Sequence, residues 1–157
     1  MVVRPPGVRL LIIRDDELLL TREYRLDLDA FDVRLPGGKV VDTMLEAEVL
    51  EHQDLEQAVV RAADRELREE VGMVCPRWSH FDVMRAGSSI EWDLWYLQGH
   101  DPEVLAAGAE PEAGEWIEPM WVPFETARSL CLSGEIREAR SAIAIIRLLE
   151  RLKDPEQ

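Results

Sequence analysis

Apolar residues in the first quarter of the chain come in short runs separated by polar turns. Residues 8–13 form an apolar run rich in branched side chains, and the polar stretch 14–17 separates it from a second run at 18–21. Runs of this length, bounded by polar clusters, are typical of β-strands. The pattern predicts two strands joined by a polar turn, followed by a brief strand at 33–35 that enters the turn Pro36-Gly37-Gly38.

A second set of strands is predicted beyond the middle of the chain. Residues 80–84 and 90–97 are apolar segments on either side of Gly87-Ser88-Ser89, and 116–122 is expected to form a last strand. Successive side chains of a strand point to opposite faces. One face of 90–97 therefore carries Trp92, Leu94 and Tyr96, and the other carries Glu91, Asp93 and Trp95. Tryptophans in such positions are more often core or interface residues than stacking plates for a base.

The longest internal helix is predicted over residues 55–71. Its apolar positions fall on one face, which we expect to pack on the sheet: Ala58, Val59, Ala62, Ala63 and Leu67. Asp54 and Gln57 have the spacing of a capping box, and Gly72 is placed to end the helix. Two further helices are expected, one closing near Gly134 and a long amphipathic one that ends near residue 154.

Three carboxylates gather near the end of the internal helix. Glu66, Glu69 and Glu70 are three and four residues apart, a spacing that places side chains on one side of a helix. Like charges at this spacing repel, so a cation is expected among them. Magnesium-like ions take oxygen ligands, usually a few carboxylates with waters and substrate phosphates. The cluster therefore predicts a metal platform, and a solvated acidic face is the alternative.

The same stretch resembles a known family signature. Arg65-Glu66-Leu67-x-Glu69-Glu70-x-Gly72-Met73 is similar to the second half of the signature of Nudix hydrolases. The first half departs from the signature, because Gln57 stands where the family has a glutamate that braces the helix. If Gly38 is the opening glycine, the segment carries thirteen extra residues. We interpret residues 41 to about 55 as an insertion, forming an added surface helix or a flap.

Composition narrows the class of protein. The 157 residues, 46% of them apolar, are enough for one domain with a hydrophobic core, so we expect a single domain over residues 1–157. A net charge of −14 and a pI near 4.6 argue against nucleic acid and anionic membranes as partners. Cys75 and Cys131 form no zinc or disulfide pattern. The start lacks the layout of a signal peptide, and we expect a cytoplasmic protein.

The resemblance implies a fold and a metal site. The fold expected is α+β, the Nudix fold: an α/β/α sandwich with a mixed β-sheet and the signature as a loop-helix-loop. The cofactor implied is Mg²⁺ or Mn²⁺. The residues assigned to it by likeness are the carbonyl of Gly37 and the side chains of Glu66, Glu69 and Glu70. Gly38 is expected beside the substrate, because paired glycines let a ligand approach the backbone closely.

A narrower likeness points to the ADP-ribose pyrophosphatase subgroup. The run Arg22-Glu23-Tyr24-Arg25 resembles one carried there, and the resemblance assigns Arg25 to the diphosphate; an exposed strand end is the alternative. Glu91 loosely matches a glutamate that opens a strand near the site. The polar stretch 101–118 resembles the loop that supplies the general base, with Glu112 or Glu115 as candidates and Glu69 as a further catalytic residue.

The reaction implied is metal-dependent hydrolysis of a nucleoside diphosphate linked to another group, with ADP-ribose giving AMP and ribose 5-phosphate. Two alternatives stay open. One is a Nudix-fold module that binds a nucleotide-sugar without hydrolysis. The other is a hydrolase for another nucleoside diphosphate sugar, a dinucleoside polyphosphate or a nucleoside triphosphate. The subgroup also implies a homodimer.

Overall fold

The first two long strands form the hairpin from which the sheet is built. The computed structural model describes residues 1–50 and 52–154, with residues 52 and 53 described for the backbone only. β2 (Gly7–Arg14) and β3 (Glu17–Arg25) are joined at Asp15 and Asp16. Asp15 adopts the left-handed conformation, with a φ of 54°. The predicted hairpin is confirmed, and both strands extend beyond their apolar runs.

Five more strands complete the central sheet. They are β4 (Ala30–Arg34), β5 (Gly37–Lys39), β7 (Arg77–Arg85), β9 (Asp93–His100) and β11 (Ile117–Pro123). The main order is β11-β3-β2-β9-β7, while β4 pairs with β3 and β5 pairs with β2. β2 and β9 are parallel, and the other neighbours are antiparallel. β2 and β3 pair only near their turn, which leaves space for β5 along β2 and for β4 along β3.

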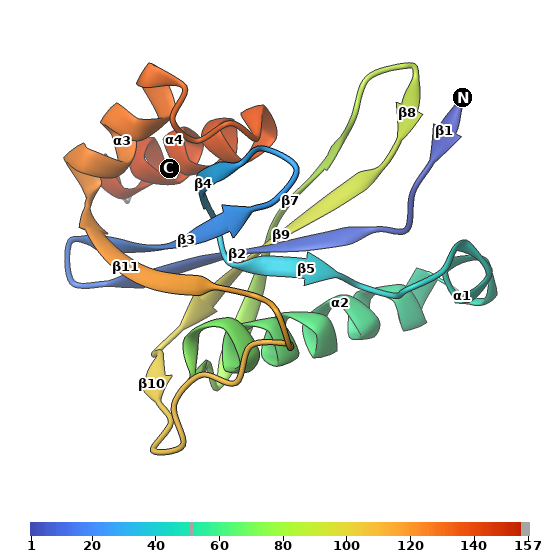
Figure 1. The fold of residues 1–157 in the computed structure, drawn as a ribbon, viewed down its shortest axis with the longest axis horizontal. Helices are drawn as coiled ribbons and strands as arrows, with labels where there is room; N and C mark the ends of the chain where they lie inside the picture. Colours follow the sequence, from blue (N-terminus) through green and yellow to red (C-terminus); the bar gives the residue numbers. More distant parts are fainter. Residues whose placement is uncertain (51, 155–157) are drawn as a thin grey trace.

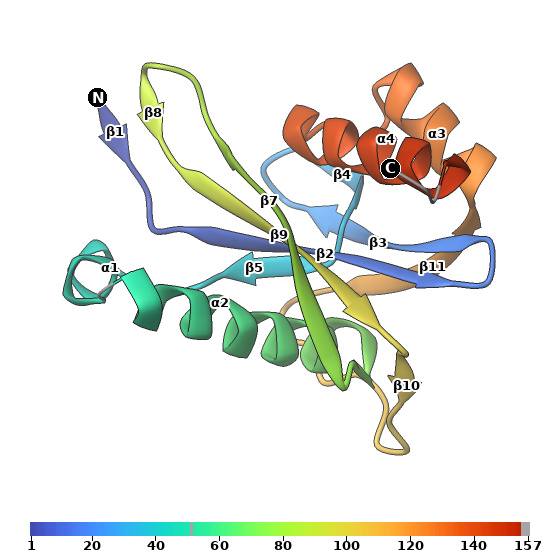
Figure 2. The same cartoon turned by 180° about the vertical axis from the view of Figure 1, so that it is seen from behind.

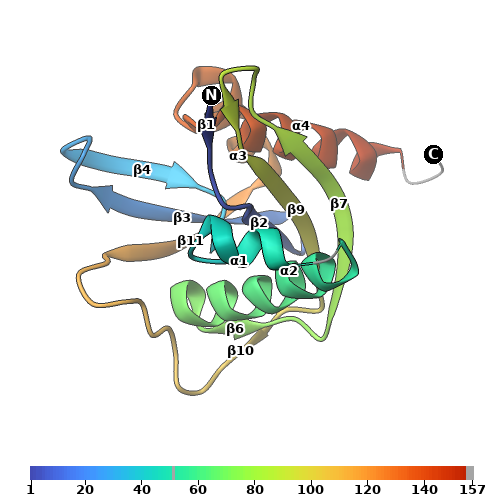
Figure 3. The ribbon, with the colours of Figure 1, turned by 90° about the vertical axis from the view of Figure 1, so that its right-hand side faces the viewer.

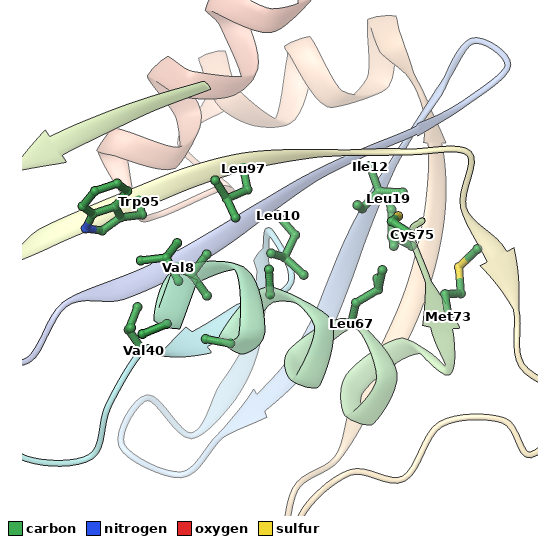
Figure 4. Packing of buried hydrophobic residues seen from close by; sticks show 14 residues of the cluster. Val8, Leu10, Ile12, Leu19, Val40, Leu67, Met73, Cys75, Trp95 and Leu97 are labelled. Carbon is green, nitrogen blue, oxygen red and sulfur yellow. The ribbon is translucent and has the colours of Figure 1, made fainter. Parts of the chain in front are cut away.

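One face of the sheet is covered by α2 (His52–Glu66) (Figure 1 and Figure 2). Its predicted apolar face is buried against alternate residues of β2, namely Val8, Leu10 and Ile12 (Figure 4). Trp95 and Leu97 of β9 belong to the same core cluster. Period-two alternation along the strands thus selects the side chains that meet the helix.

The opposite face is covered by α3 (Phe124–Ser133) and α4 (Ala139–Lys153). The strand residues between those of the first cluster form this second core, with Leu11, Leu18, Leu20, Leu94 and Tyr96 among its members. Ala144, Ile145, Leu148 and Leu149 of α4 pack on them. Leu94 and Tyr96 lie on one face and Trp95 on the other, as the alternation predicted. The α+β sandwich with a mixed sheet is confirmed.

The acidic end of the internal helix differs from a plain α-helix. The helix was predicted as continuous over residues 55–71, but α2 ends at Glu66 and the last turn, Leu67–Val71, is a π-helix labelled η1. Single π-turns are frequent at functional sites. Gly72 ends η1 in the left-handed conformation, as predicted, with a φ of 72°. A two-stranded ladder follows, formed by β6 (Met73–Val74) and β10 (Glu103–Val104).

The inserted segment contains a short helix, α1 (Met44–Val49). Its capping box is formed by Thr43 and Glu46. The box predicted at Asp54 is wrong, because α2 already begins at His52 and Asp54 lies within its first turn. Part of the predicted insertion, residue 51, lies outside the described residues. Among the described helices, none has the length and apolar character to cross a membrane.

The predicted strand over residues 90–97 is interrupted. β8 (Ile90–Glu91) leaves the sheet at Trp92 and pairs in parallel with β1 (Val2–Val3). The guanidinium of Arg140 lies over the Trp92 ring, 4.5 Å from its centroid, and donates a hydrogen bond of 2.8 Å to the Trp92 carbonyl. The Trp92 carbonyl also accepts a hydrogen bond of 3.2 Å from the Ala86 amide, so Trp92 stays attached to the end of β7 although the strand is interrupted there.

Truncating α4 on its buried face should destabilise the fold. Leu148 is 2% exposed, and Leu148→Ala leaves a cavity. We expect a loss of about 2–5 kcal/mol in the free energy of unfolding. Ile143→Ala on the exposed side of the same helix is the matched control, with an expected change within about 0.5 kcal/mol. Urea denaturation followed by circular dichroism measures both, and equal losses would contradict the packing described.

Candidate active site

Gly37 and Gly38 lie against the C-terminal end of the internal helix. The turn predicted over Pro36-Gly37-Gly38 is wrong for the two glycines, because they pair with β2 as the first residues of β5. The amide of Gly37 donates a hydrogen bond of 2.9 Å to Oε2 of Glu70. The Glu66 carboxylate packs directly on Gly38, where a Cβ atom would overlap it. Gly37 has a φ of 146°, a conformation open to glycine and strained for other residues. The pair of glycines therefore brings the backbone within contact of two carboxylates.

These two carboxylates are poorly accommodated as anions. Burial is the main cause that raises the pKa of Glu70 to about 8, and the charges of Glu66 and Glu23 act in the same direction. The Gly37 amide opposes this rise without reversing it. Burial also raises the pKa of Glu66, with Glu69 contributing in the same sense. A bound cation would relieve all of these effects together.

The loop between β10 and β11 brings a further carboxylate to the site. Two backbone hydrogen bonds attach the loop to the signature: Leu105 N donates to the Gly72 carbonyl at 2.8 Å, and Glu110 N donates to the Glu69 carbonyl at 2.9 Å. The Glu115 carboxylate is close enough to Glu66 to raise its pKa. The pKa of Glu115 is raised in turn, chiefly by burial.

The two candidates for the general base, Glu112 and Glu115, differ in their surroundings. Glu115 interacts with the charges of Glu66 and Glu69. Glu112 contacts Glu115, and its amide donates a hydrogen bond of 3.2 Å to Oε2 of Glu115. Glu115 is therefore the loop carboxylate whose charge acts on the acidic cluster, and its role as general base stays a prediction.

Arg25 is the last residue of β3, and the turn between β3 and β4 lies on the same side of the molecule as the C-terminal end of α2 (Figure 3). It pairs with Asp27 at 3.1 Å and with Glu23 at 3.7 Å. Glu23 also pairs with Arg34 at 2.9 Å. Glu23 and Arg34 were not among the predicted site residues. Period-two alternation along β3 would have found Glu23, because it puts Glu23 and Arg25 on one face.

Glu91 is not brought to the acidic cluster within the chain. It lies on β8, opposite Val3, and lines a hollow with Arg4, Met44 and Asp93. In Figure 1 this strand lies at the end of the molecule that carries the N-terminus and α1, whereas η1 lies at the other end of the helix. The assignment of Glu91 to substrate binding stays a prediction.

The donor set fits a hard divalent cation. Among the described residues, no three His, Cys, Asp or Glu side chains form a group that could hold a metal ion. The site instead offers two adjoining carboxylates, Glu66 and Glu70, beside the backbone at the start of β5. Mg²⁺ is commonly bound by one or two carboxylates, with waters and substrate phosphates completing the shell. Glu69 lies nearby, as its effect on Glu66 shows, and its metal role and that of the Gly37 carbonyl stay predictions.

Comparison with known proteins gives one family. A family model described as the NUDIX domain matches residues 3–143. No curated protein matches the chain.

Three solved structures share the fold. An ADP compounds hydrolase is 24% identical with a TM-score of 0.74, over 98% of this chain and 77% of that one. A MutT NUDIX hydrolase from Burkholderia pseudomallei is 23% identical with a TM-score of 0.54, over 77% and 84%. A NUDIX hydrolase from Nitrosomonas europaea is 17% identical with a TM-score of 0.62, over 90% and 86%.

Neutralising Glu70 should stabilise the metal-free protein. The pKa of Glu70 is about 8 in the folded chain and 4.5 ordinarily, so the folded chain binds more protons than the unfolded chain between pH 4.5 and pH 8. Stability present below pH 4.5 is therefore lost as the pH rises to about 8. In EDTA at pH 8 we expect Glu70→Gln to melt at least about 2 °C higher than the unmodified chain, a shift equivalent to about 1 kcal/mol.

The control and the pH series make this prediction specific. The difference in melting temperature should shrink at pH 5, and added Mg²⁺ should stabilise the unmodified chain more than Glu70→Gln. Glu103→Gln, an exposed substitution of the same chemistry, should show neither effect. Differential scanning calorimetry measures all three proteins. A melting temperature of Glu70→Gln that is lower at every pH would contradict the electrostatic account.

Proposed function

The chain belongs to the NUDIX domain family and is a pyrophosphohydrolase, and from that premise we propose that its substrate is ADP-ribose, cleaved to AMP and ribose 5-phosphate. The observation that carries the proposal is the contact of two half-buried carboxylates, Glu66 and Glu70, with Gly37 and Gly38 at the start of β5. This arrangement suits a divalent ion that must bind phosphate oxygens at the same time. The solved ADP compounds hydrolase, which is named for its action on ADP compounds, has a related fold.

The chemistry of diphosphate hydrolysis explains what such a site must do. Attack of water on a phosphoanhydride adds negative charge to oxygens that are already anionic. A chain with a net charge of −14 repels such a substrate, so counter-charge has to be supplied locally. A divalent ion held by Glu66 and Glu70, with Glu69 and the Gly37 carbonyl as further ligands, would neutralise the diphosphate and acidify the attacking water.

The remaining steps are assigned to side chains of the protein. Glu115 accepts the proton of the attacking water. Its pKa is raised by burial and by neighbouring carboxylates, which brings it closer to neutral pH and makes it a better general base. Arg25 binds the diphosphate from the end of β3 through its planar guanidinium. Gly38 lets the substrate approach the backbone, and AMP leaves as one product.

The substrate class and the oligomeric state have different support. Small nucleotide substrates follow from the family, while a nucleotide-sugar is part of the proposal. The homodimer stays a prediction. Size-exclusion chromatography with light scattering, which gives the mass of the protein in solution, tests it directly.

Hydrolysis should depend on the metal-site carboxylates. With ADP-ribose and Mg²⁺ or Mn²⁺, we expect AMP release that Glu70→Gln lowers by at least about a hundredfold, the scale on which one positioned catalytic group acts. Glu103→Gln should retain full activity. Separation of products by anion-exchange chromatography, over a panel of nucleoside diphosphate sugars, dinucleoside polyphosphates and nucleoside triphosphates, measures the preference.

The loop carboxylates should differ in their effects. Glu115→Gln is expected to lower kcat by about a hundredfold or more and to flatten the acidic limb of the pH–rate profile, because the general base is lost. Glu112→Gln, on the adjoining turn, should change kcat less than about fivefold. Equal loss in both variants would assign the loop a structural role. Tight binding of ADP-ribose without any product would instead identify a binding module.

A further inference from the structure

The α2-facing side of the β3–β4 hairpin carries an ordered set of opposite charges. The register places Glu23 opposite Asp32 and Thr21 opposite Arg34. Directly opposed residues of an antiparallel pair point to the same face. Leu19, two residues before Thr21 and four before Glu23, lies on the same face of β3. Leu19 belongs to the hydrophobic core that packs on α2, so this face of the hairpin is the one that faces α2.

This charged face adjoins the acidic cluster. Gly37, three residues after Arg34, donates a hydrogen bond of 2.9 Å to Oε2 of Glu70, and only two residues separate the end of β4 from the start of β5. The hairpin, the loop before β11 and the C-terminal end of α2 lie on one side of the molecule (Figure 3). Arg34 is thus a cation beside carboxylates that would hold metal.

The hydrogen bonding of Arg34 is incomplete. Its Nη1 donates a hydrogen bond of 2.9 Å to Oε2 of Glu23, and its Nε lies 3.8 Å from Oδ2 of Asp32, beyond hydrogen-bond distance. A guanidinium has five N–H donors. Within the described chain its side chain makes no other hydrogen bond recorded in the structure, although 23% of it is exposed. Oδ1 of Asp32 is buried without a hydrogen-bond partner there.

A stabilising role alone does not account for this pair. Removing charges from water costs free energy that a half-buried ion pair recovers only with good geometry and further hydrogen bonds. Glu23 fixes one edge of the Arg34 guanidinium and leaves the other N–H groups for an acceptor. Phosphate oxygens match the fork of a guanidinium in geometry and charge.

We propose that Arg34 binds the diphosphate of the substrate and that Glu23 is the positioning residue that holds its guanidinium toward the metal carboxylates. The choice of a diphosphate rests on the function proposed above. Arg34 then faces the substrate from the wall formed by β4, while Arg25 approaches from the end of β3. The two arginines share Glu23 as their common ion-pair partner.

Binding of inorganic pyrophosphate tests the proposal without turnover. Isothermal titration calorimetry in Mg²⁺ buffer compares the unmodified chain with Arg34→Gln, Arg34→Lys, Glu23→Gln and Arg22→Gln. Arg22 is the matched control. It shares the face of β3 that carries Tyr24, opposite to that of Glu23, and it pairs with the exposed Glu118. We expect Arg34→Gln to bind pyrophosphate roughly tenfold to a hundredfold more weakly, as for lost charged hydrogen bonds. Arg34→Lys should fall between, and Arg22→Gln should be unchanged.

Two readouts separate direct contact from a structural effect. Millimolar guanidinium should restore part of the activity of Arg34→Ala, because it can occupy the vacated position, and should not help Arg22→Ala. Glu23→Gln should lower kcat more than it raises KM, since the charge of Arg34 remains but its orientation is lost. Unchanged pyrophosphate binding in Arg34→Gln, or absence of rescue, would overturn the proposal.

The outcomes also separate this inference from the proposed function. Hydrolysis of ADP-ribose with normal kinetics in Arg34→Gln rejects the inference alone. Failure to hydrolyse ADP-ribose, with pyrophosphate binding that still depends on Arg34, rejects the substrate and keeps the inference. Should Arg34→Gln fail to fold, the double variant Glu23→Gln/Arg34→Gln replaces it, because both members of the closest pair are removed together and Arg25 keeps its ion pair with Asp27.

Discussion

The site depends on carboxylates held where their negative charge is unfavourable. Glu66 and Glu70 are partly removed from water, and they repel each other. They also lie at the C-terminal end of a helix, which already carries negative partial charge. The Gly37 amide compensates only in part. Such an arrangement is stable when a bound ligand supplies the opposite charge. A divalent cation offsets the loss of water, the mutual repulsion and the charge of the helix end together.

The sheet sets the position of every group around these carboxylates. β2 holds the α2 core through alternate residues and pairs with β5, so Gly37 and Gly38 are fixed over the helix end. β3 directs Glu23 and Arg25 to the same side through the same alternation. The loop before β11 is attached to the helix end by its own backbone hydrogen bonds, which bring Glu115 into range of Glu66. A rigid scaffold thus positions groups from four separate segments.

The departures of the signature are understandable from the structure. Gln57 is exposed on α2 and lies nine residues before Glu66, which corresponds to about 13 Å along the helix axis. It is therefore remote from the acidic end, and its identity bears little on the charges there. The inserted segment forms α1 at the opposite end of the same helix, where an addition to a surface connection is tolerated. Both changes leave the contact of the carboxylates with the two glycines intact.

Local pattern sufficed for much of the molecule. Alternation and helical periodicity are local properties, so the sequence by itself determined the first hairpin, the buried face of α2, the end of that helix at Gly72 and the acidic triplet. It did not determine which distant segments meet. That the charge of Glu115 acts on Glu66, that Glu91 lies elsewhere in the chain, and that Glu23 pairs with Arg34 were decided by tertiary structure alone. Strand register and loop attachment join residues that no sequence spacing relates.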